Sequence, residues 1–173
     1  MRHILGTLLV IGTTLAALAA PATAADPLMV FLVRHAERMD AGQDPQLSLQ
    51  GHQRAAELVV LLRDSGIDHV HSTDFNRTRD TAGPVATTLG LGDVLLYDPS
   101  DLPALRERLT RDGGRHLVVG HSNTTPALVE LFGGEAGAPI DEEGECDRLY
   151  IVTVGDDDSV STVLLRYGSP YEG

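Results

Sequence analysis

The 173-residue sequence contains no lysine and only a single cysteine, Cys146. One cysteine cannot form a disulfide within the chain, so stability must come from a packed core, which about 150 residues can supply. The basic residues are 13 arginines, against 25 aspartates and glutamates, and the net charge is −12. So acidic a chain is a poor partner for nucleic acid or for an anionic membrane surface. The sequence shows no internal repeat, no low-complexity linker and no second domain.

A long apolar run, residues 4–18, lies near the N-terminus behind two basic residues. Two glycines interrupt it, and it is shorter than the roughly 20 apolar residues that a transmembrane helix needs. Ala22-Thr23-Ala24 follows as a small-residue cleavage site, so residues 1–24 are predicted to be a secretory signal peptide. We therefore expect residues 25–173 to form one domain, periplasmic or secreted, without stable membrane insertion once the signal is removed.

Strand-like and helix-like segments alternate along the chain, and Ser48 and Ser100 or Asp101 are suitable N-caps for two of the helices. The expected order is strand 28–33, helix 48–63, strand 69–72, helix 76 or 77 to 89 with an irregularity at Gly83-Pro84, strand 94–97, helix 102–111, strand 117–120, a helix from 125 to about 133, and strands 148–154 and 159–166. This alternation predicts an α/β fold, a three-layer α/β/α sandwich with a mainly parallel central sheet. The acidic, glycine-containing turn before the last strand predicts an antiparallel C-terminal strand pair.

Two histidines directly follow two of the apolar strands. His35 comes after the first strand, next to Arg34, and His121 comes after the strand at 117–120. In an open α/β sheet, groups just past the carboxyl ends of the strands line the crevice where ligands bind. The two imidazoles and Arg34 are therefore expected to converge on one small anion. Because the chain as a whole repels anions, such a ligand must be held by cations gathered in one pocket.

Four motifs occur in order, each at a strand-to-helix junction. They are Arg34-His35-Ala36-Glu37, the segment Pro45 to Gly51 (Pro-Gln-Leu-Ser-Leu-Gln-Gly), Ser72 to Ala82 with Arg77 four residues before Thr81, and Gly120-His121-Ser122-Asn123. Together they resemble the motifs of the histidine phosphatase superfamily, over nearly the whole chain after the signal. Two features depart from the family pattern: Ala36 replaces the usual glycine, and Ser122-Asn123 follows the second histidine.

The resemblance implies a phosphoric monoester hydrolase that uses no cofactor and no metal. His35 would attack phosphorus and form a phosphohistidine intermediate that water hydrolyses. His121 would be protonated and bind the transferring phosphoryl group, while Arg34 and Arg77 hold its oxygens through bidentate hydrogen bonds. Arg79 is an alternative anion ligand, but the family spacing to the following threonine selects Arg77.

The leaving alkoxide needs a proton, which a carboxyl group of raised pKa in a partly desolvated pocket can donate. Asp98, directly after the third strand, is the expected general acid, whereas Asp101 is expected to cap a helix and Glu37 to orient the nucleophile. Ser72 and Asn123 are further candidates for supporting contacts. Asn123 suits two roles equally, contact with the substrate or capping of the following helix.

A metal site is the main alternative use of the histidines, because His69 and His71 form a spaced pair on one strand. The arginines beside His35 would repel a cation, so no metal is assigned. The histidines at 52, 69, 71 and 116 are expected at the surface or in packing.

Two other classes of function are compatible with parts of the sequence. A noncatalytic exported phosphate-binding or sensor protein needs the cations but no nucleophile, and an envelope interaction protein would leave Arg34 and Arg77 unexplained. A mutase is disfavoured for a short, exported chain. The expected partner is a small phosphorylated substrate or a phosphorylated envelope component, recognised mostly by its phosphoryl group in a shallow pocket.

Overall fold

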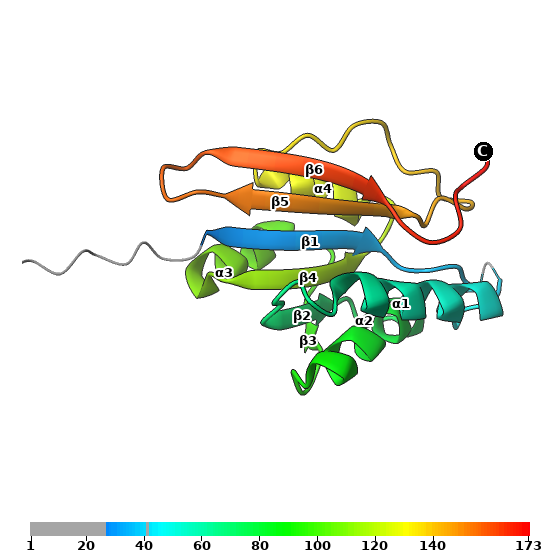
Figure 1. Cartoon of the computed structure of the whole chain (residues 1–173). Coiled ribbons are helices and arrows are strands. Elements are labelled where there is room, and N and C mark those ends of the chain that lie inside the picture. Colours follow the sequence, from blue (N-terminus) through cyan, green and yellow to red (C-terminus); the bar gives the residue numbers. More distant parts are fainter. Residues whose placement is uncertain (1–26, 41) are drawn as a thin grey trace, which may run out of the picture.

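The computed structural model describes residues 27–40 and 42–173, so the predicted signal peptide lies outside the described residues. The elements follow one another as β1 (Leu28–Arg34), α1 (Leu49–Leu62), β2 (His69–Ser72), α2 (Asn76–Leu89), β3 (Leu95–Leu96), α3 (Leu102–Asp112), β4 (Arg115–Gly120), α4 (Thr124–Leu131), β5 (Arg148–Val154) and β6 (Val160–Arg166). Figure 1 shows one mixed sheet with helices on both sides.

The sheet contains six strands in the order β3-β2-β4-β1-β5-β6. The first four of these run parallel, whereas β5 pairs antiparallel with β1, and β6 pairs antiparallel with β5. The α/β class, the mainly parallel sheet and the antiparallel C-terminal pair are thus confirmed. In register, Arg34 lies opposite Gly120, and Ser72 lies opposite Val119. The residues that follow β1, β4 and β2 therefore meet at one edge of the sheet.

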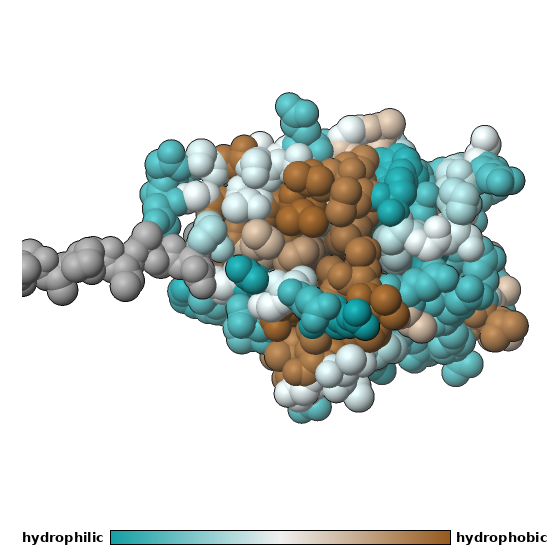
Figure 2. Space-filling view, viewed as in Figure 1, coloured by the Kyte–Doolittle hydropathy of each residue, from teal (hydrophilic) through white to brown (hydrophobic). Residues whose placement is uncertain are grey.

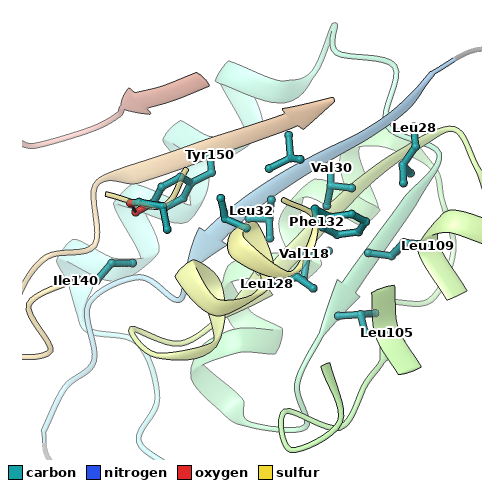
Figure 3. Packing of buried hydrophobic residues seen from close by; sticks show 13 residues of the cluster. Leu28, Val30, Leu32, Leu105, Leu109, Val118, Leu128, Phe132, Ile140 and Tyr150 are labelled. Carbon is teal, nitrogen blue, oxygen red and sulfur yellow. Dashed lines mark hydrogen bonds between the residues drawn. The ribbon is translucent and has the colours of Figure 1, made fainter. Parts of the chain in front are cut away.

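Strand β1 is buried on both faces, which explains its continuous apolar run. Val30 and Leu32 pack in a cluster with residues of α3 and α4, which Figure 3 shows from close by. Phe31 and Val33 point to the opposite face and pack in a second cluster that includes Leu58 of α1. The alternation of side chains along the strand therefore builds the two cores of the sandwich.

The start of α1 explains the motif that ends at Gly51. Ser48 caps the helix, since its Oγ accepts a hydrogen bond of 3.1 Å from the Gly51 nitrogen. A Cβ atom at position 51 would lie 2.1 Å from the carbonyl oxygen of Glu37, closer than any side chain tolerates. Glycine is therefore needed here because α1 packs directly on the segment that follows His35.

Helix α2 differs from the prediction because it continues without interruption through Pro84. A proline inside a helix removes one hydrogen bond to the carbonyl four residues earlier, here that of Asp80. Pro84 is exposed, so the missing hydrogen bond lies on the solvent-facing side of the helix. Gly90 ends α2 in the left-handed conformation, with φ of 68°.

Some apolar side chains remain at the surface, as the brown region of Figure 2 shows on the face seen in Figure 1. On the edge strand β6, Val163 and Leu165 are exposed, and so is Val60 of α1. Among the described helices, none combines the length and the apolar composition needed to cross a bilayer.

Two buried histidines link β2 and β4 through a continuous chain of hydrogen bonds. His116 Nε2 donates to the carbonyl oxygen of Gly113 at 2.7 Å, which leaves its Nδ1 to accept from His71 Nε2 at 3.0 Å. His71 Nδ1 in turn accepts from Arg108 Nη2 at 3.1 Å. Each of the two rings therefore has one nitrogen that donates and one that accepts a hydrogen bond, so both imidazoles are neutral. Burial, then the charges of His116 and Arg108, lower the pKa of His71 to about 3.

We expect the protein to be less stable at pH 5 than at pH 7. A histidine that stays neutral in the fold contributes fully above its unfolded pKa of 6.5, and this stability is lost as the pH falls toward the folded pKa. The loss at pH 5 is about 2 kcal/mol for each such histidine. Urea unfolding at both pH values measures it. The change His71→Gln should shrink the difference, whereas His52→Gln on the exposed side of α1 should not; equal differences in all three proteins would contradict the assignment.

Candidate active site

His35 follows β1 and is held in one tautomer by its own loop. Its backbone nitrogen donates to the carbonyl of Gly120 on β4 at 2.9 Å, and its side-chain Nδ1 lies 2.8 Å from the carbonyl oxygen of Ala36. Because a carbonyl only accepts, Nδ1 carries the proton and Nε2 keeps a free lone pair. Burial and, to a smaller extent, Arg34 lower the pKa of His35 to about 3. The imidazole is therefore neutral near pH 7, as a nucleophile must be.

His121 follows β4 and lies next to His35, with 5.6 Å between the ring centroids. Its Nε2 is 3.0 Å from Thr73 Oγ1, and its Nδ1 is 3.4 Å from Arg77 Nη2. Burial, then Arg77 and Arg34, lower the pKa of His121 to about 4. This environment favours the neutral imidazole near pH 7 as long as no anion is bound. The negative charge of a phosphoryl group in contact would raise this pKa again.

Arg77 stands in the first turn of α2 and supplies the free cationic donors of the site. Its guanidinium carbon lies 4.5 Å from the ring centre of Phe75, and its Nη1 is 3.8 Å from Asp44. Within the described part of the chain, the buried Nε and Nη1 have no hydrogen-bond partner. Arg79 instead pairs with Asp74 at 2.6 Å on the exposed surface. The structure thus brings Arg77, and not Arg79, beside His121.

Arg34 also binds the backbone of a distant loop, which the sequence did not indicate. Nη1 donates to the carbonyls of Asp141 at 2.6 Å and Glu145 at 3.1 Å, and Nη2 donates to that of Glu142. These bonds use three of the five N–H groups of the guanidinium. The buried Nε, which has no partner among the described residues, and one N–H of Nη2 are left for an anion.

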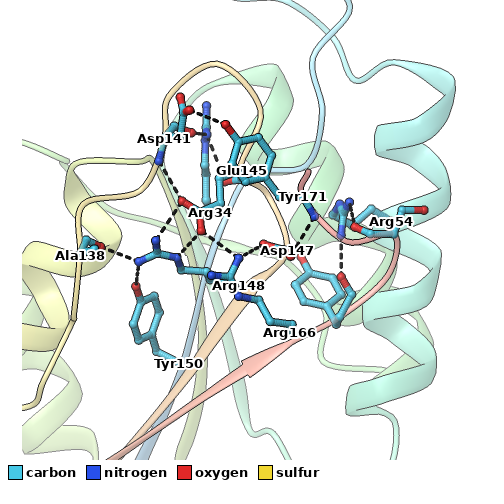
Figure 4. Close-up of polar contacts among 12 residues, drawn as sticks. Arg34, Arg54, Ala138, Asp141, Glu145, Asp147, Arg148, Tyr150, Arg166 and Tyr171 are labelled. Carbon is cyan, nitrogen blue, oxygen red and sulfur yellow. Dashed lines mark hydrogen bonds and ion pairs between the residues drawn. The ribbon is translucent and has the colours of Figure 1, made fainter. Parts of the chain in front are cut away.

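The loop that Arg34 holds, residues 137–147, is itself fixed by a buried polar network (Figure 4). Glu145 accepts from Arg148 at 2.7 and 2.9 Å and from Arg166 at 2.8 Å. Asp147 accepts from Arg166 at 2.5 Å, and the hydroxyl of Tyr171 donates to Asp141. Charged groups paired in this way give the loop a single position at the edge of the sheet.

The residues after β1, β4 and β2 enclose a pocket of about 250 Å³. It is lined by Arg34, His35, Arg38, Arg77, His121, Ser122, Asn123 and Glu142. A second cavity of about 510 Å³ shares Arg34, His35 and Arg38 with it. The C-terminal segment around Tyr171 forms one wall of this second cavity.

Sequence reasoning assigned no role to three residues of this pocket, Arg38, Ser122 and Glu142. Arg38 lies three residues beyond His35, and its place beside the nucleophile motif was the available signal. Glu142 belongs to a loop without hydrophobic periodicity, in an acidic stretch that a solvated surface explains equally well.

Asp98 does not have the environment expected of a general acid, which corrects the sequence prediction. Its carboxylate is exposed and accepts hydrogen bonds from the backbone nitrogen and hydroxyl of Ser100, at 2.8 and 2.7 Å. These bonds lower its pKa, the reverse of what proton donation near neutral pH requires. Asp98 lines a different cavity, beside α3.

The supporting residues are placed as follows. Among the described residues, the Ser72 hydroxyl donates only to the carbonyl of Thr73, and it is the side chain of Thr73 that contacts His121. Asn123 lines the pocket and makes no side-chain capping bond, so the structure does not show the capping role. Glu37 is held by Arg54, whose Nε lies 2.9 and 3.0 Å from its two oxygens.

The spacing between Arg77 and Thr81 has a structural reason. Thr81 Oγ1 donates to the carbonyl of Arg77 at 2.7 Å and accepts from the backbone nitrogen of Ala36 at 3.0 Å. One hydroxyl thereby connects the turn that carries the arginine with the loop that carries the nucleophile.

The family model of the histidine phosphatase superfamily (branch 1) matches residues 30–112. The probable phosphoglycerate mutase GpmB of Escherichia fergusonii is 42% identical over 87 residues, covering 46% of this chain and 38% of the relative. The same protein of Erwinia tasmaniensis is 39% identical over 75 residues, covering 39% and 35%. The chain thus spans little more than a third of the length of these curated relatives.

Solved structures show the same fold. The protein histidine phosphatase SixA complexed with tungstate aligns with a TM-score of 0.64 at 20% identity, over 80% of this chain and 96% of that one. The putative phosphohistidine phosphatase SixA from Agrobacterium tumefaciens aligns with a TM-score of 0.60 at 21% identity, over 83% and 99%. The resemblance inferred from the four motifs is confirmed.

Proposed function

We propose that this chain, whose residues 30–112 match the histidine phosphatase superfamily, is a metal-independent phosphatase that hydrolyses a phosphomonoester or phosphoramidate. A phosphohistidine on His35 is the intermediate. One observation carries the proposal: His35 presents a neutral imidazole with an unprotonated Nε2 to a pocket that also contains the unpaired donors of Arg77. A protein that only binds phosphate needs the donors but has no use for a fixed nucleophile.

The geometry supports a division of labour between these residues. Arg77 holds the oxygens of the phosphoryl group, and Arg34 adds its Nε. His121, drawn into its protonated form by the bound negative charge, donates to another oxygen. His35 Nε2 then attacks phosphorus, and water later releases phosphate from the histidine. The hydrogen bond to Ala36 keeps Nδ1 protonated and aims Nε2 at the pocket.

The natural substrate is proposed from the expected location. With residues 1–24 as a cleaved signal, the enzyme acts in the periplasm or outside the cell. A small phosphorylated molecule or a phosphorylated envelope component is then the substrate, and the cavity of about 510 Å³ beside His35 accommodates its non-phosphoryl part.

Hydrolysis of p-nitrophenyl phosphate by the purified protein, with and without a chelator, tests the proposal. We expect turnover that the chelator does not change. Activity that is lost with the chelator and restored by a divalent metal would overturn the metal-independent mechanism. Tight phosphate binding without turnover of any of a panel of phosphate esters would favour the noncatalytic binding protein.

A further inference from the structure

We propose that Glu142 is the general acid of this site, donating the proton that the leaving oxygen needs. The inference rests on the proposed phosphatase function and assigns a group that the sequence motifs do not contain. It replaces Asp98, which lines another cavity and accepts two hydrogen bonds from Ser100.

The position of Glu142 is the first argument. Among the described residues that line the pocket of about 250 Å³, it is the only one with a carboxyl group. Its charge is close enough to Arg77 to act on that guanidinium. A carboxyl group at this place faces the same space as the Nε2 of His35 and the cations that hold the phosphoryl group.

The rigidity of the loop is the second argument. The Glu142 carbonyl accepts from Arg34 Nη2, and the carbonyls of Asp141 and Glu145 accept from Nη1. The Asp141 nitrogen also donates to Glu145 Oε2 at 2.9 Å. Arg34, directly before the nucleophile, therefore fixes the backbone that carries the Glu142 carboxyl group. This is the role of the hydrogen bonds from its terminal nitrogens. Such preorganisation is what a proton donor requires.

Glu37 lies two residues beyond the nucleophile but does not line this pocket, and its carboxylate is engaged by an arginine. Arg54 holds both of its oxygens, with Nε at 2.9 and 3.0 Å and Nη2 at 2.7 Å from Oε1. This pairing turns both carboxylate oxygens of Glu37 toward Arg54. Within the described residues no ion pair holds the carboxyl group of Glu142, which lines the pocket.

The two chemical steps balance through Glu142. In the first, a bond forms between His35 Nε2 and phosphorus while the bond from phosphorus to the ester oxygen breaks, and the proton of the Glu142 carboxyl group passes to that oxygen. The alcohol leaves. In the second, water attacks phosphorus and gives a proton to the Glu142 carboxylate, and the electron pair of the nitrogen–phosphorus bond returns to Nε2. Inorganic phosphate leaves and both groups are restored.

The test compares Glu142→Gln with wild type on two esters whose leaving groups differ. p-Nitrophenolate is stable without a proton, whereas the alkoxide of phenethyl phosphate is not. We expect kcat/KM for phenethyl phosphate to fall by about 100-fold or more, and that for p-nitrophenyl phosphate to change by less than about threefold. Glu142 is exposed, so the change should not disturb folding.

Glu135→Gln is the matched control, because it removes the same charge from an exposed glutamate that lines neither cavity beside His35. It should affect both esters equally and little. An equal loss on both esters in E142Q, a loss on neither, or the same ester dependence in E135Q would overturn the assignment. Failure of wild type to hydrolyse even p-nitrophenyl phosphate would instead contradict the proposed phosphatase, so the two failures are distinguishable.

Discussion

Replacing His35 with alanine is expected to lower kcat for p-nitrophenyl phosphate by about 10⁴-fold or more, because the nucleophile itself is removed. The neutral imidazole, fixed by its bond to Ala36, is the group that makes the covalent bond to phosphorus. The cations remain in place, so the variant should still bind inorganic phosphate with similar affinity. Steady-state kinetics and calorimetric titration with phosphate measure the two effects separately.

His52→Ala is the control for this variant, since it removes a histidine from the exposed side of α1 and should keep full activity. Thermal unfolding shows whether the His35 variant keeps the fold, because that side chain is buried. A folded His35→Ala protein that retains more than a tenth of the wild-type kcat would contradict the role of His35.

The second large effect is expected for Arg77→Gln, which keeps a polar side chain but removes the charge. Arg77 has two buried nitrogens without a hydrogen-bond partner in the described part of the chain, and its nearest carboxylate, that of Asp44, is 3.8 Å from Nη1, so both donors are available to the phosphoryl group. Loss of one preorganised charged donor of this kind lowers kcat/KM by about 100- to 1000-fold. The affinity for inorganic phosphate should fall as well, unlike in the His35 variant.

Arg79→Gln distinguishes the two arginines of this helix. Arg79 lies two residues further on, is exposed and pairs with Asp74, so the change should alter kcat/KM by no more than about twofold. A larger effect at position 79 than at position 77 would mean that the family spacing selects the wrong arginine.

The fold was largely predictable because its signals are local. Apolar runs bounded by turn residues marked the strands, and Ser48 and Asp101 cap α1 and α3 as expected. Since β1 and β4 are parallel neighbours, the residues after them had to meet at one edge of the sheet. That single inference placed His35 beside His121.

The parts of the site that were not predictable depend on contacts between distant residues. Arg34 bonds carbonyls more than 100 residues away, and no motif in the sequence indicates which backbone groups will face it. Asp98 follows a strand as expected, but a local turn with Ser100 directs its carboxylate to solvent. Glu142 lies in an irregular loop, whose position only the tertiary network determines.

The central claim is the covalent phosphohistidine on His35, and trapping the phosphoenzyme tests it most directly. The protein is mixed with a phosphate ester labelled in the phosphoryl group, quenched in base within the first turnovers, and digested for mass spectrometry. The account predicts an acid-labile, base-stable phosphoryl group on the peptide that contains His35, and none in the His35→Ala protein. A phosphoryl group on another residue, or turnover by wild type with inverted configuration at phosphorus and no phosphoenzyme, would contradict it.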